Sequence, residues 1–293
     1  MSDDAVRKVA AMYSGHARGY ADSWSLVIRP LGRRLLATMP WDTARRVLDL
    51  GTGTGALLPD ISAAAPPSTF VLGVDPSWGM LEIARTHGTR LAVMDGMRLG
   101  LRTASFDIVV MAFVLFHMTA PDVALSEVSR VLAARGHVGT VTWAEDPELE
   151  ATQVFERELD AQGAWDPAPV GPSDHSRTNS TDKIAALFRQ AGLEPVKVWI
   201  EPLVHRWTLE PFITLRATYG RTMRKLRSLD SAAQAEFLAR VRARLATLEP
   251  GAFVFRGAVV CGTARRAGPA HSPRLSHDRF GRVQGVGGGD YDP

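Results

Sequence analysis

The residues that decide the fold form one short segment, Val47-Leu48-Asp49-Leu50-Gly51-Thr52-Gly53-Thr54-Gly55. Its apolar first part, together with residue 46, predicts a buried β-strand. Glycines at alternate positions after a strand let a ligand approach the backbone closely. A helix predicted at 54–65 would then point its N-terminus at that ligand. The segment therefore predicts a ligand-binding loop between a strand and a helix.

Strand and helix patterns alternate along the first half of the chain. Two helices, at 3–20 and 26–39, precede the first strand, and later helices begin at Ser77 and cover 121–132. Further strands are predicted at 69–74, 90–94, 106–111 and 138–143. Such alternation is typical of βαβ units. We therefore predict an α/β fold with a doubly wound, seven-stranded, mostly parallel sheet of Rossmann-like topology.

The pattern changes after Trp143. The elements predicted there are helices at 148–162 and 184–191, an extended segment at 195–207, basic helices at 211–227 and 231–248, and a strand at 253–263. The second basic helix begins with a capping-box signature, Ser231-x-x-Gln234. From Arg265 onward Gly, Pro, Arg and His dominate. We predict a cofactor-binding core with N-terminal helices at 1–143, a cap with the last strands at 144–267 and a disordered tail at 268–293.

Composition and charge exclude several classes of protein. The 293 residues are 45% hydrophobic, enough for a sizeable core, and the formal net charge is only +3. Cys261 is the single cysteine, which excludes an internal disulfide and a cysteine-based zinc site, and we predict no metal site. The N-terminus is acidic, and the longest uncharged apolar run, 108–116, is too short to cross a bilayer. We therefore expect a cytoplasmic protein without a membrane span.

The end of the second strand narrows the class of ligand. Asp75 stands there, where an acidic residue can accept hydrogen bonds from both ribose hydroxyls, so a ligand containing adenosine is expected. The loop also satisfies the dinucleotide fingerprint through Gly51, Gly53 and Ala56. However, Asp49 would lie close to a bound pyrophosphate. A cofactor with an ammonium group and no phosphate therefore fits the loop better.

Several motifs resemble those of the class I S-adenosylmethionine-dependent methyltransferases and follow the same order along the chain. The resemblance is closest to the small-molecule branch that includes ubiquinone and menaquinone biosynthesis enzymes. The loop 49–55 resembles the family's first motif, 105–110 its fourth-strand motif, and 127–132 the helix before the fifth strand. The resemblance is strong over 10–145 and looser over 181–264. It departs at residues 134–137, where Ala-Arg-Gly-His replaces the usual Pro-Gly-Gly turn.

The resemblance implies roles for individual residues. Asp49 would help to bind the methionine part of the cofactor, Asp75 the ribose, and Met80 and Asp95 the adenine. The implied cofactor-binding residues are Tyr13, Tyr20, Asp49, Gly51, Thr52, Gly53, Gly55, Asp75, Pro76, Met80, Asp95, Gly96, Met97, Ala112 and Phe113.

Some of these assignments have simpler alternatives. Asp75 before Pro76 and Asp95 before a glycine both suit ordinary turns. Tyr13 and Tyr20 resemble the paired aromatics that close over the cofactor in that family, but their spacing also suits one apolar face of a helix.

His117 is the candidate catalytic residue. It follows the fourth strand, and its unperturbed pKa suits proton removal near neutrality. The methyl sulfonium of the implied cofactor is already an activated electrophile, so transfer can need only alignment of the acceptor for in-line attack. We carry both hypotheses, a general base and a residue that shapes the pocket, and lean toward the second. We expect His16, His175 and His205 to be surface or lid residues.

The sequence therefore predicts methyl transfer from S-adenosylmethionine to an O, N or C atom of a small molecule in biosynthesis, with S-adenosylhomocysteine as product. One alternative is a cofactor-binding protein without methyl transfer, such as a cyclase or a non-catalytic partner. A third is an NAD(P)-dependent oxidoreductase. Nucleic acid is disfavoured as the substrate, because Ala112-Phe113-Val114-Leu115 stands where base-amino methyltransferases carry Asn/Asp-Pro-Pro-aromatic.

The predicted cap is basic and contains several aromatic residues. A solvated helix face accounts for its arginines, and a phosphate, a carboxylate or an acidic carrier protein as ligand is the alternative. The aromatic residues that we expect to line a pocket are Trp143, Trp165, Trp207 and Phe212.

Overall fold

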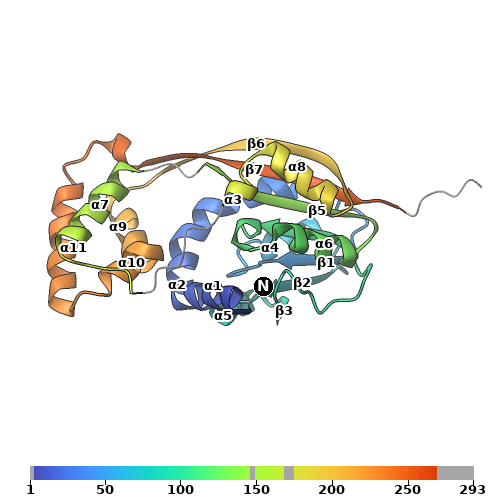
Figure 1. Ribbon diagram of the computed structural model, residues 1–293, viewed down its shortest axis with the longest axis horizontal. Coiled ribbons are helices and arrows are strands. Elements are labelled where there is room, and N and C mark those ends of the chain that lie inside the picture. The colour runs from blue at the N-terminus through green and yellow to red at the C-terminus, as the bar shows by residue number, and fades with distance from the viewer. Residues whose placement is uncertain (1–2, 146–148, 168–174, 269–293) are drawn as a thin grey trace, which may run out of the picture.

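The computed structural model describes residues 3–145, 149–167 and 175–268. A seven-stranded sheet runs through it in the order β3-β2-β1-β4-β5-β7-β6 (Figure 1). Strands β1 to β5 pair in parallel, and β7 is antiparallel to both β5 and β6. The strands are β1 Arg46–Leu50, β2 Phe70–Asp75, β3 Arg90–Val93, β4 Phe106–Ala112, β5 Leu132–Glu145, β6 Leu193–Arg206 and β7 Val254–Arg266. The predicted fold class is confirmed.

Helices cover both faces of the sheet, because successive strand residues point to opposite sides. Val47 and Ile108 belong to one core with α3 (Ser25–Leu36) and α4 (Leu58–Ala64). Leu48 and Val109, each one residue further along, belong to a second core with α6 (Pro121–Val131) and α8 (Thr181–Gln190). The loops at the carboxyl ends of β1 and β4 are therefore supported from two sides.

The N-terminal helices follow one another almost without interruption. Helices α1 (Asp3–Gly15) and α2 (Ala17–Gly19) lead into a π-helical turn, Tyr20–Trp24, and then into α3. π-Helical turns are rare in proteins, and many of those that occur lie at functional sites. The predicted pair of helices at 3–20 and 26–39 is confirmed in outline, whereas nothing in the sequence indicated the π-turn.

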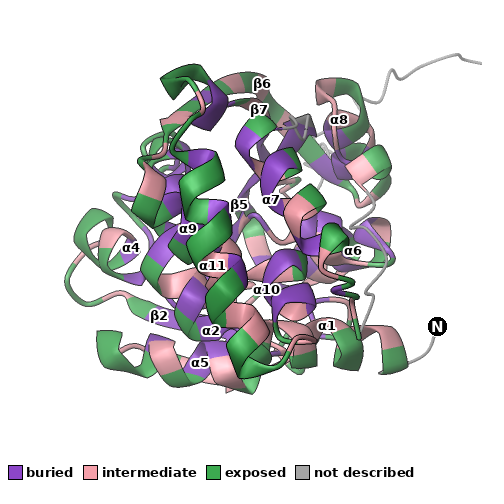
Figure 2. Ribbon diagram, turned by 90° about the vertical axis from the view of Figure 1, so that its left-hand side faces the viewer, coloured by how far each residue is buried: buried purple, intermediate pink, exposed green. Residues whose placement is uncertain are grey.

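The cap lies at one end of the molecule and is joined to the sheet by β6 and β7 (Figure 1). It contains α7 (Glu150–Ala161), α9 (Leu209–Thr218), α10 (Gly220–Leu226) and α11 (Ser231–Leu245). Its centre is apolar: Phe155 and Phe237 are fully buried with their ring centroids 5.1 Å apart, and Phe212 is fully buried too. Figure 2, which looks at this end, shows exposed residues alternating with buried ones along these helices.

The prediction of one helix at 211–227 is wrong. The helix breaks at Tyr219, which is extended with φ −137° and ψ 143°, and Gly220 follows at φ +73°. Glycine adopts this left-handed conformation without the steric penalty of a Cβ atom. The break turns Tyr219 out of the helical repeat, so its side chain need not follow the face of either helix.

Three predicted boundaries also need correction. Helix α4 begins at Leu58 instead of residue 54, because the residues before it form the turns of the glycine loop. The N-cap of α11 is Asp230, whose Oδ1 accepts from the Ala233 amide at 2.9 Å, so Ser231 does not cap the helix. Strand β7 continues to Arg266, whereas we placed the start of the non-periodic tail at residue 265. Residues 269–293 of the predicted tail lie outside the described residues.

None of the helices in the described ranges is both long and apolar enough to span a bilayer.

Candidate functional site

A cavity opens at the carboxyl ends of β1, β2 and β4, under α1. Including its mouth, its empty volume is about 1140 Å³, enough for a nucleoside-sized ligand. Fifteen of the sixteen predicted site residues line it, counting His117, and they come from α1, the π-turn and the loops after four strands. Gly55 is not among the described lining residues. The spacing of motifs along the chain therefore located one common site.

The glycines of the loop have different local roles. A Cβ atom on Gly51 (φ +75°) would lie 2.3 Å from Cγ2 of Val114, whereas one on Gly53 (φ +54°) would meet nothing within 4 Å. Gly53 thus presents open backbone to the cavity. A Cβ atom on Gly55 would lie 2.8 Å from the His87 ring, so this glycine serves the packing of the loop against its neighbours.

Asp75 ends β2 beside the glycine loop. Its Oδ2 accepts from the Gly53 amide at 3.0 Å and its Oδ1 from the Ser77 amide at 2.8 Å. Burial raises the pKa of Asp75 to about 6, and the hydrogen bonds from Ser77 and Gly53 oppose that rise. Each carboxylate oxygen keeps a lone pair for a ligand hydroxyl. The turn hydrogen bond and a ribose contact are therefore compatible at this residue.

Asp49 is a buried carboxylate at the base of the same loop. It is 2% exposed, and its Oδ2 accepts from the Thr52 hydroxyl at 2.7 Å. Burial raises its pKa to about 6, with Thr52 acting in the opposite direction. Within the described ranges Asp49 forms no ion pair. A ligand ammonium group would supply the missing positive charge.

Arg29 on α3 was not predicted as a site residue. It is the one lysine or arginine among the described residues that line the cavity. Its Nε donates to Oδ2 of Asp60 at 2.8 Å, and Arg33 pairs with the same carboxylate at 3.3 Å. Two cations share one anion, so a net positive charge remains for a ligand carboxylate. Because the sequence shows only one arginine among several on a helix, spatial neighbours were needed to find it.

The turn after β3 brings Asp95 and Met97 into the cavity. Oδ1 of Asp95 accepts from the Met97 amide at 2.9 Å, so the turn interpretation of this residue is correct, and its other oxygen is not engaged by that bond. A Cβ atom on Gly96 would lie 2.5 Å from Cε of Met118. The small residue therefore lets this turn pack against the loop after β4.

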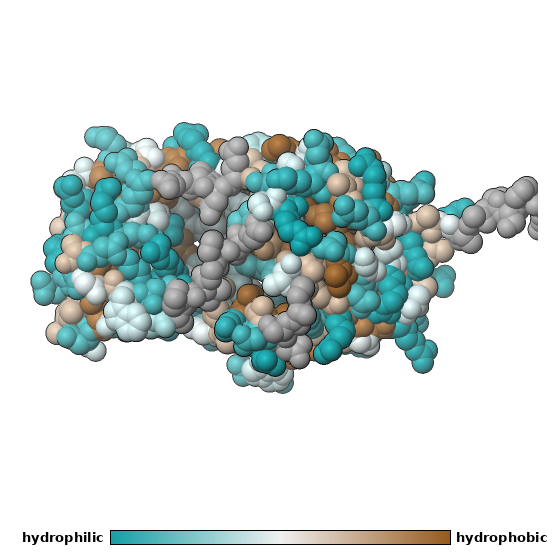
Figure 3. All heavy atoms as spheres, in the orientation of Figure 1, coloured by the Kyte–Doolittle hydropathy of each residue, from teal (hydrophilic) through white to brown (hydrophobic). Residues whose placement is uncertain are grey.

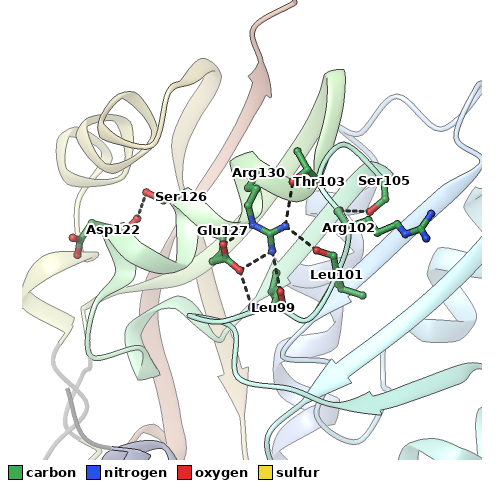
Figure 4. A network of polar contacts seen from close by, with 9 residues as sticks. All are labelled: Leu99, Leu101, Arg102, Thr103, Ser105, Asp122, Ser126, Glu127 and Arg130. Carbon is green, nitrogen blue, oxygen red and sulfur yellow. Dashed lines mark hydrogen bonds and ion pairs between the residues drawn. The ribbon is translucent and has the colours of Figure 1, made fainter.

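A polar network holds the chain that follows this turn (Figure 4). Arg130 on α6 donates to the carbonyl oxygens of Leu99 and Leu101 at 2.9 and 2.7 Å. It also pairs with Glu127 at 2.7 Å, and Glu127 in turn accepts from the Leu99 amide at 2.8 Å. Glu127 and Arg130 belong to a motif that the sequence analysis singled out. Their role is to fix a loop next to the cavity instead of contacting a ligand.

Ser14 fastens α1 over the cavity and was not predicted. The hydroxyl oxygens of Ser14 and Ser77 are 2.8 Å apart, and the Gly79 amide donates to Ser14 at 3.2 Å. Ser77 is the N-cap of α5 (Trp78–Ala84), as predicted, and accepts from the Met80 amide. A Cβ atom on Gly79 would lie 2.8 Å from the Ser14 Cα. The first helix thus sits directly on the start of α5.

Tyr13 reaches from α1 to the loop after β4. Its hydroxyl is 2.7 Å from Nε2 of His117, and its ring is 6.0 Å from that of Tyr20. Burial and, to a smaller extent, nearby His175 lower the pKa of His117 to about 3, so the imidazole is neutral around pH 7. Burial likewise raises the pKa of Tyr13 well above its ordinary value. Both hydrogen-bonding partners are therefore uncharged.

The other histidines differ from expectation in one case. His175 stacks on Phe116 and His205 lies against Trp207, both half-buried. His16, expected at the surface or in a lid, is only 4% exposed. It is enclosed because the rings of Tyr13 and Tyr219 stand 5.4 and 4.8 Å from it.

The aromatic residues expected to line a pocket do not line this cavity within the described chain. Phe212 is in the centre of the cap, and Trp165 is 62% exposed. Trp207 packs against the apolar core that contains residues of α3 and α4. Trp143 is one layer removed, with its ring 5.1 Å from that of Phe113, which does line the cavity. Phe113 has φ +57°, which is unusual for an aromatic residue. Strained backbone conformations of this kind are frequent at functional sites.

The arginines of the cap are largely paired within the cap. Arg224 makes a bidentate pair with Asp166, Arg221 pairs with Glu156, Arg240 with Glu158, Arg242 with Glu210 and Lys225 with Asp160. The surface of this end is mainly hydrophilic (Figure 3). The basic residues therefore complement acidic ones, which agrees with the solvated-face interpretation. No cluster of His, Cys, Asp or Glu suited to a metal ion occurs in the described part of the chain.

This arrangement defines the class of protein to which the chain belongs. A glycine loop after β1, an acidic residue at the end of β2 and a cavity at the carboxyl edge of the sheet are the features of nucleoside-cofactor binding in doubly wound folds. Asp49 and Asp75, which form no ion pair within the described ranges, distinguish it from a pyrophosphate site.

Comparison with known proteins gives the family. A family model described as a methyltransferase domain matches residues 48–139. The malonyl-(acyl-carrier protein) O-methyltransferase of Geobacter sulfurreducens is 30% identical over 203 residues, 67% of this chain and 73% of that protein. The ubiquinone biosynthesis O-methyltransferase of a Ruegeria species is 27% identical over 177 residues, 56% of this chain and 67% of that protein. The chain belongs to the class I S-adenosylmethionine-dependent methyltransferases, in their small-molecule branch.

A solved structure agrees at the level of the fold. The 4+2 cyclase SpnF superposes with a TM-score of 0.58 over 89% of this chain and 96% of that chain, at 19% identity. A likeness at that identity shows the fold alone, so it does not favour the cyclase alternative. The predicted cofactor, S-adenosylmethionine, and the predicted class of enzyme are those of the family.

Proposed function

We propose that the cavity holds S-adenosylmethionine and that a small-molecule acceptor reaches its methyl group from the side of Tyr13, Tyr20 and His117. The observation that carries this proposal is a pair of carboxylates beside the glycine loop, those of buried Asp49 and half-buried Asp75. Burial raises the pKa of both groups to about 6 despite the hydrogen bonds they accept, so a ligand that supplies positive charge and further donors would stabilise their ionised forms. The ammonium group and the ribose hydroxyls of the cofactor provide both.

Different residues would contact different parts of the cofactor. Asp49 would pair with the ammonium group and Arg29 with the carboxylate of the methionine part. Asp75 would accept from the ribose hydroxyls, while Asp95 and the Met97 amide would face the adenine. Met80, which is 2% exposed, would cover its apolar side.

The chain's part in catalysis is alignment and exclusion of water. When bound, the cofactor supplies an activated methyl group on a positively charged sulfur. Helix α1, fastened through Ser14, covers part of the site and would shield the bound cofactor from bulk water. Neutral His117 and the tyrosine hydroxyls add no positive charge close to the sulfonium. A preorganised acceptor in line with the methyl group then needs little further assistance.

His117 is assigned a positioning role. A group whose pKa is lowered to about 3 is a weak base, and its Nε2 is already 2.7 Å from the Tyr13 hydroxyl. It shapes the acceptor side of the cavity through that contact.

Several broader assignments belong to the same proposal. A biosynthetic small molecule is favoured over nucleic acid, because the cap's cations are mostly paired within the cap and the Asn/Asp-Pro-Pro-aromatic tetrapeptide is absent. A cytoplasmic location fits the single, buried Cys261. The division at residues 143 and 267 is retained, with the cap as the part that encloses the acceptor.

Two titrations and one assay test the proposal. Calorimetry should show that S-adenosylhomocysteine binds one site per chain and that NAD and NADP do not. Incubation with S-adenosylmethionine and a panel of hydroxyl, amine and carbon acceptors should release S-adenosylhomocysteine with at least one of them. Binding of NAD(P) in place of S-adenosylhomocysteine would support the oxidoreductase alternative. Tight cofactor binding without transfer to any acceptor class would support the non-catalytic alternative.

A further inference from the structure

Five aromatic side chains from three parts of the chain meet beside the cofactor cavity. We call them the aromatic cluster, and they are Tyr13, His16, Tyr20, His117 and Tyr219. Successive ring centroids are 4.8 to 6.0 Å apart. Tyr13, Tyr20 and His117 line the cavity, whereas His16 and Tyr219 lie behind them on the side of the cap. The cluster therefore spans the boundary between the cofactor cavity and the cap.

Tyr219 is brought to the cluster by two features of the backbone. It stands at the break between α9 and α10, next to left-handed Gly220. In addition, Gly19 allows α2 to lie against the end of α9: a Cβ atom there would be 2.3 Å from the Thr218 carbonyl oxygen. This close approach sets the Tyr219 ring 4.8 Å from that of His16. The cap is thus built to deliver this tyrosine to the N-terminal helices.

His16 has an unsatisfied nitrogen at this boundary. The residue is 4% exposed, and its Nε2 has no hydrogen-bond partner within the described ranges. Native proteins rarely leave a buried polar atom unpaired, because the group has lost its hydrogen bonds to water without replacement. Burial, followed by the charges of Arg224 and Arg227, lowers the pKa of His16 to about 4. At neutral pH the imidazole is therefore uncharged and able to pair with an oxygen or a hydroxyl.

We propose that His16 and Tyr219 form a second subsite that binds the part of the methyl acceptor remote from the transferred methyl group. The inference rests on the proposed function, because it places the acceptor against the same cavity. Tyr219 belongs to the cap and covers His16 at a ring distance of 4.8 Å, and it lies between two helices instead of within one. In this proposal the ring has to turn aside when the acceptor binds, so that Nε2 is uncovered for the ligand.

The chemistry of the subsite selects a class of acceptor. Its walls are flat aromatic rings, which favour edge-to-face or offset contact with another planar ring. Its polar groups are a neutral imidazole and tyrosine hydroxyls, which suit a hydroxyl or carbonyl oxygen. The charges that act on His16 are those of Arg224 on α10 and Arg227 just after it, so a cationic acceptor is disfavoured. The expected acceptor carries an uncharged planar ring with a hydroxyl group distant from the methylated atom.

Calorimetry on protein saturated with S-adenosylhomocysteine tests this assignment with three probes of similar shape. These are 2-naphthol, 2-methylnaphthalene and 2-naphthylmethylammonium. We expect 2-naphthol to bind about tenfold more tightly than the other two, because it alone offers Nε2 a neutral hydroxyl partner. In His16→Phe the preference for 2-naphthol over 2-methylnaphthalene should fall below about twofold. The same substitution at His205, which is on β6 beside Trp207, should leave it unchanged.

Imidazole nitrogen NMR supplies a readout that a merely structural role would not move. The His16 Nε2 resonance, assigned from its loss in His16→Phe, should shift with 2-naphthol and not with 2-methylnaphthalene. An undiminished preference in His16→Phe, no binding by 2-naphthol, or displacement of S-adenosylhomocysteine by the probe would overturn the inference. Unchanged S-adenosylhomocysteine affinity in His16→Phe shows that the proposed function stands independently. Failure of the wild-type protein to bind S-adenosylhomocysteine would instead overturn the proposed function.

Discussion

The edge of the sheet and the cap contribute to the site in different ways. At the sheet edge, Asp75 is positioned by the amides of Gly53 and Ser77, and the glycine loop follows β1 directly. In the cap, Tyr219 reaches the site through packing of α9 against α2 and through a break in a helix. The partners in the first arrangement are at most 22 residues apart along the chain, whereas the second brings residue 19 against residue 218. Cofactor binding should therefore be separable from the stability of the cap.

Removing the centre of the cap should have the largest effect on stability. Phe237→Ala deletes a fully buried ring packed at 5.1 Å on Phe155, so we expect a loss of about 3–5 kcal/mol in the free energy of unfolding. Denaturant unfolding followed by circular dichroism measures it. Trp165→Ala, at a residue 62% exposed, is the matched control and should change stability by less than about 0.5 kcal/mol.

The same variant tests whether the two regions are separable. Below its unfolding transition, Phe237→Ala should bind S-adenosylhomocysteine with wild-type affinity, and the milder Phe237→Leu should do so even if the alanine variant fails to fold. A parallel loss of affinity in the leucine variant would mean that the cap and the cofactor cavity form one cooperative unit.

Removing the ribose acceptor should have the next largest effect, this time on binding. Asp75→Ala deletes the carboxylate proposed to accept from two hydroxyls, so affinity for S-adenosylhomocysteine should fall by about 2–3 kcal/mol. Asp107→Ala is the matched control, since Asp107 also accepts from two backbone amides, those of Arg45 and Arg46, away from the cavity. Equal affinities in the two variants would remove the ribose assignment.

The smallest effect is expected at the boundary between the regions. His117→Asn keeps a polar group beside Tyr13, so turnover with an acceptor found by the panel should fall by less than about tenfold. A general base would instead contribute about 10²–10⁴-fold. Since burial lowers the pKa of His117 to about 3, the histidine stays neutral above that value and the wild-type rate should show no inflection near pH 6.5. An inflection there, together with a large loss in His117→Asn, would restore the catalytic base.

The two regions also differ in what the sequence could predict. Asp49, Asp75 and the glycines were found because strand ends and positive-φ loops impose residue types at fixed spacings. Tyr219, His16 and Arg29 were missed, since their roles depend on which helices meet in space. The predicted helix at 211–227 was wrong for a related reason: a tertiary contact between Gly19 and Thr218 accompanies a break whose local mark is a single glycine, Gly220. Glu127 and Arg130 were recognised as a motif, but only the structure gave their task of fixing the loop at 99–101.

The most direct test of the central claim is proton release when the cofactor product binds. Asp49 and Asp75 have pKa values of about 6 in the free protein, and the bound ligand should stabilise their ionised forms. Titration with S-adenosylhomocysteine at pH 6, in two buffers of different ionisation enthalpy, should therefore reveal release of about one proton per ligand. Affinity should weaken as pH falls below 6, because protons then compete with the ligand. Buffer-independent heats at pH 6, with affinity unchanged down to pH 5, would contradict the account.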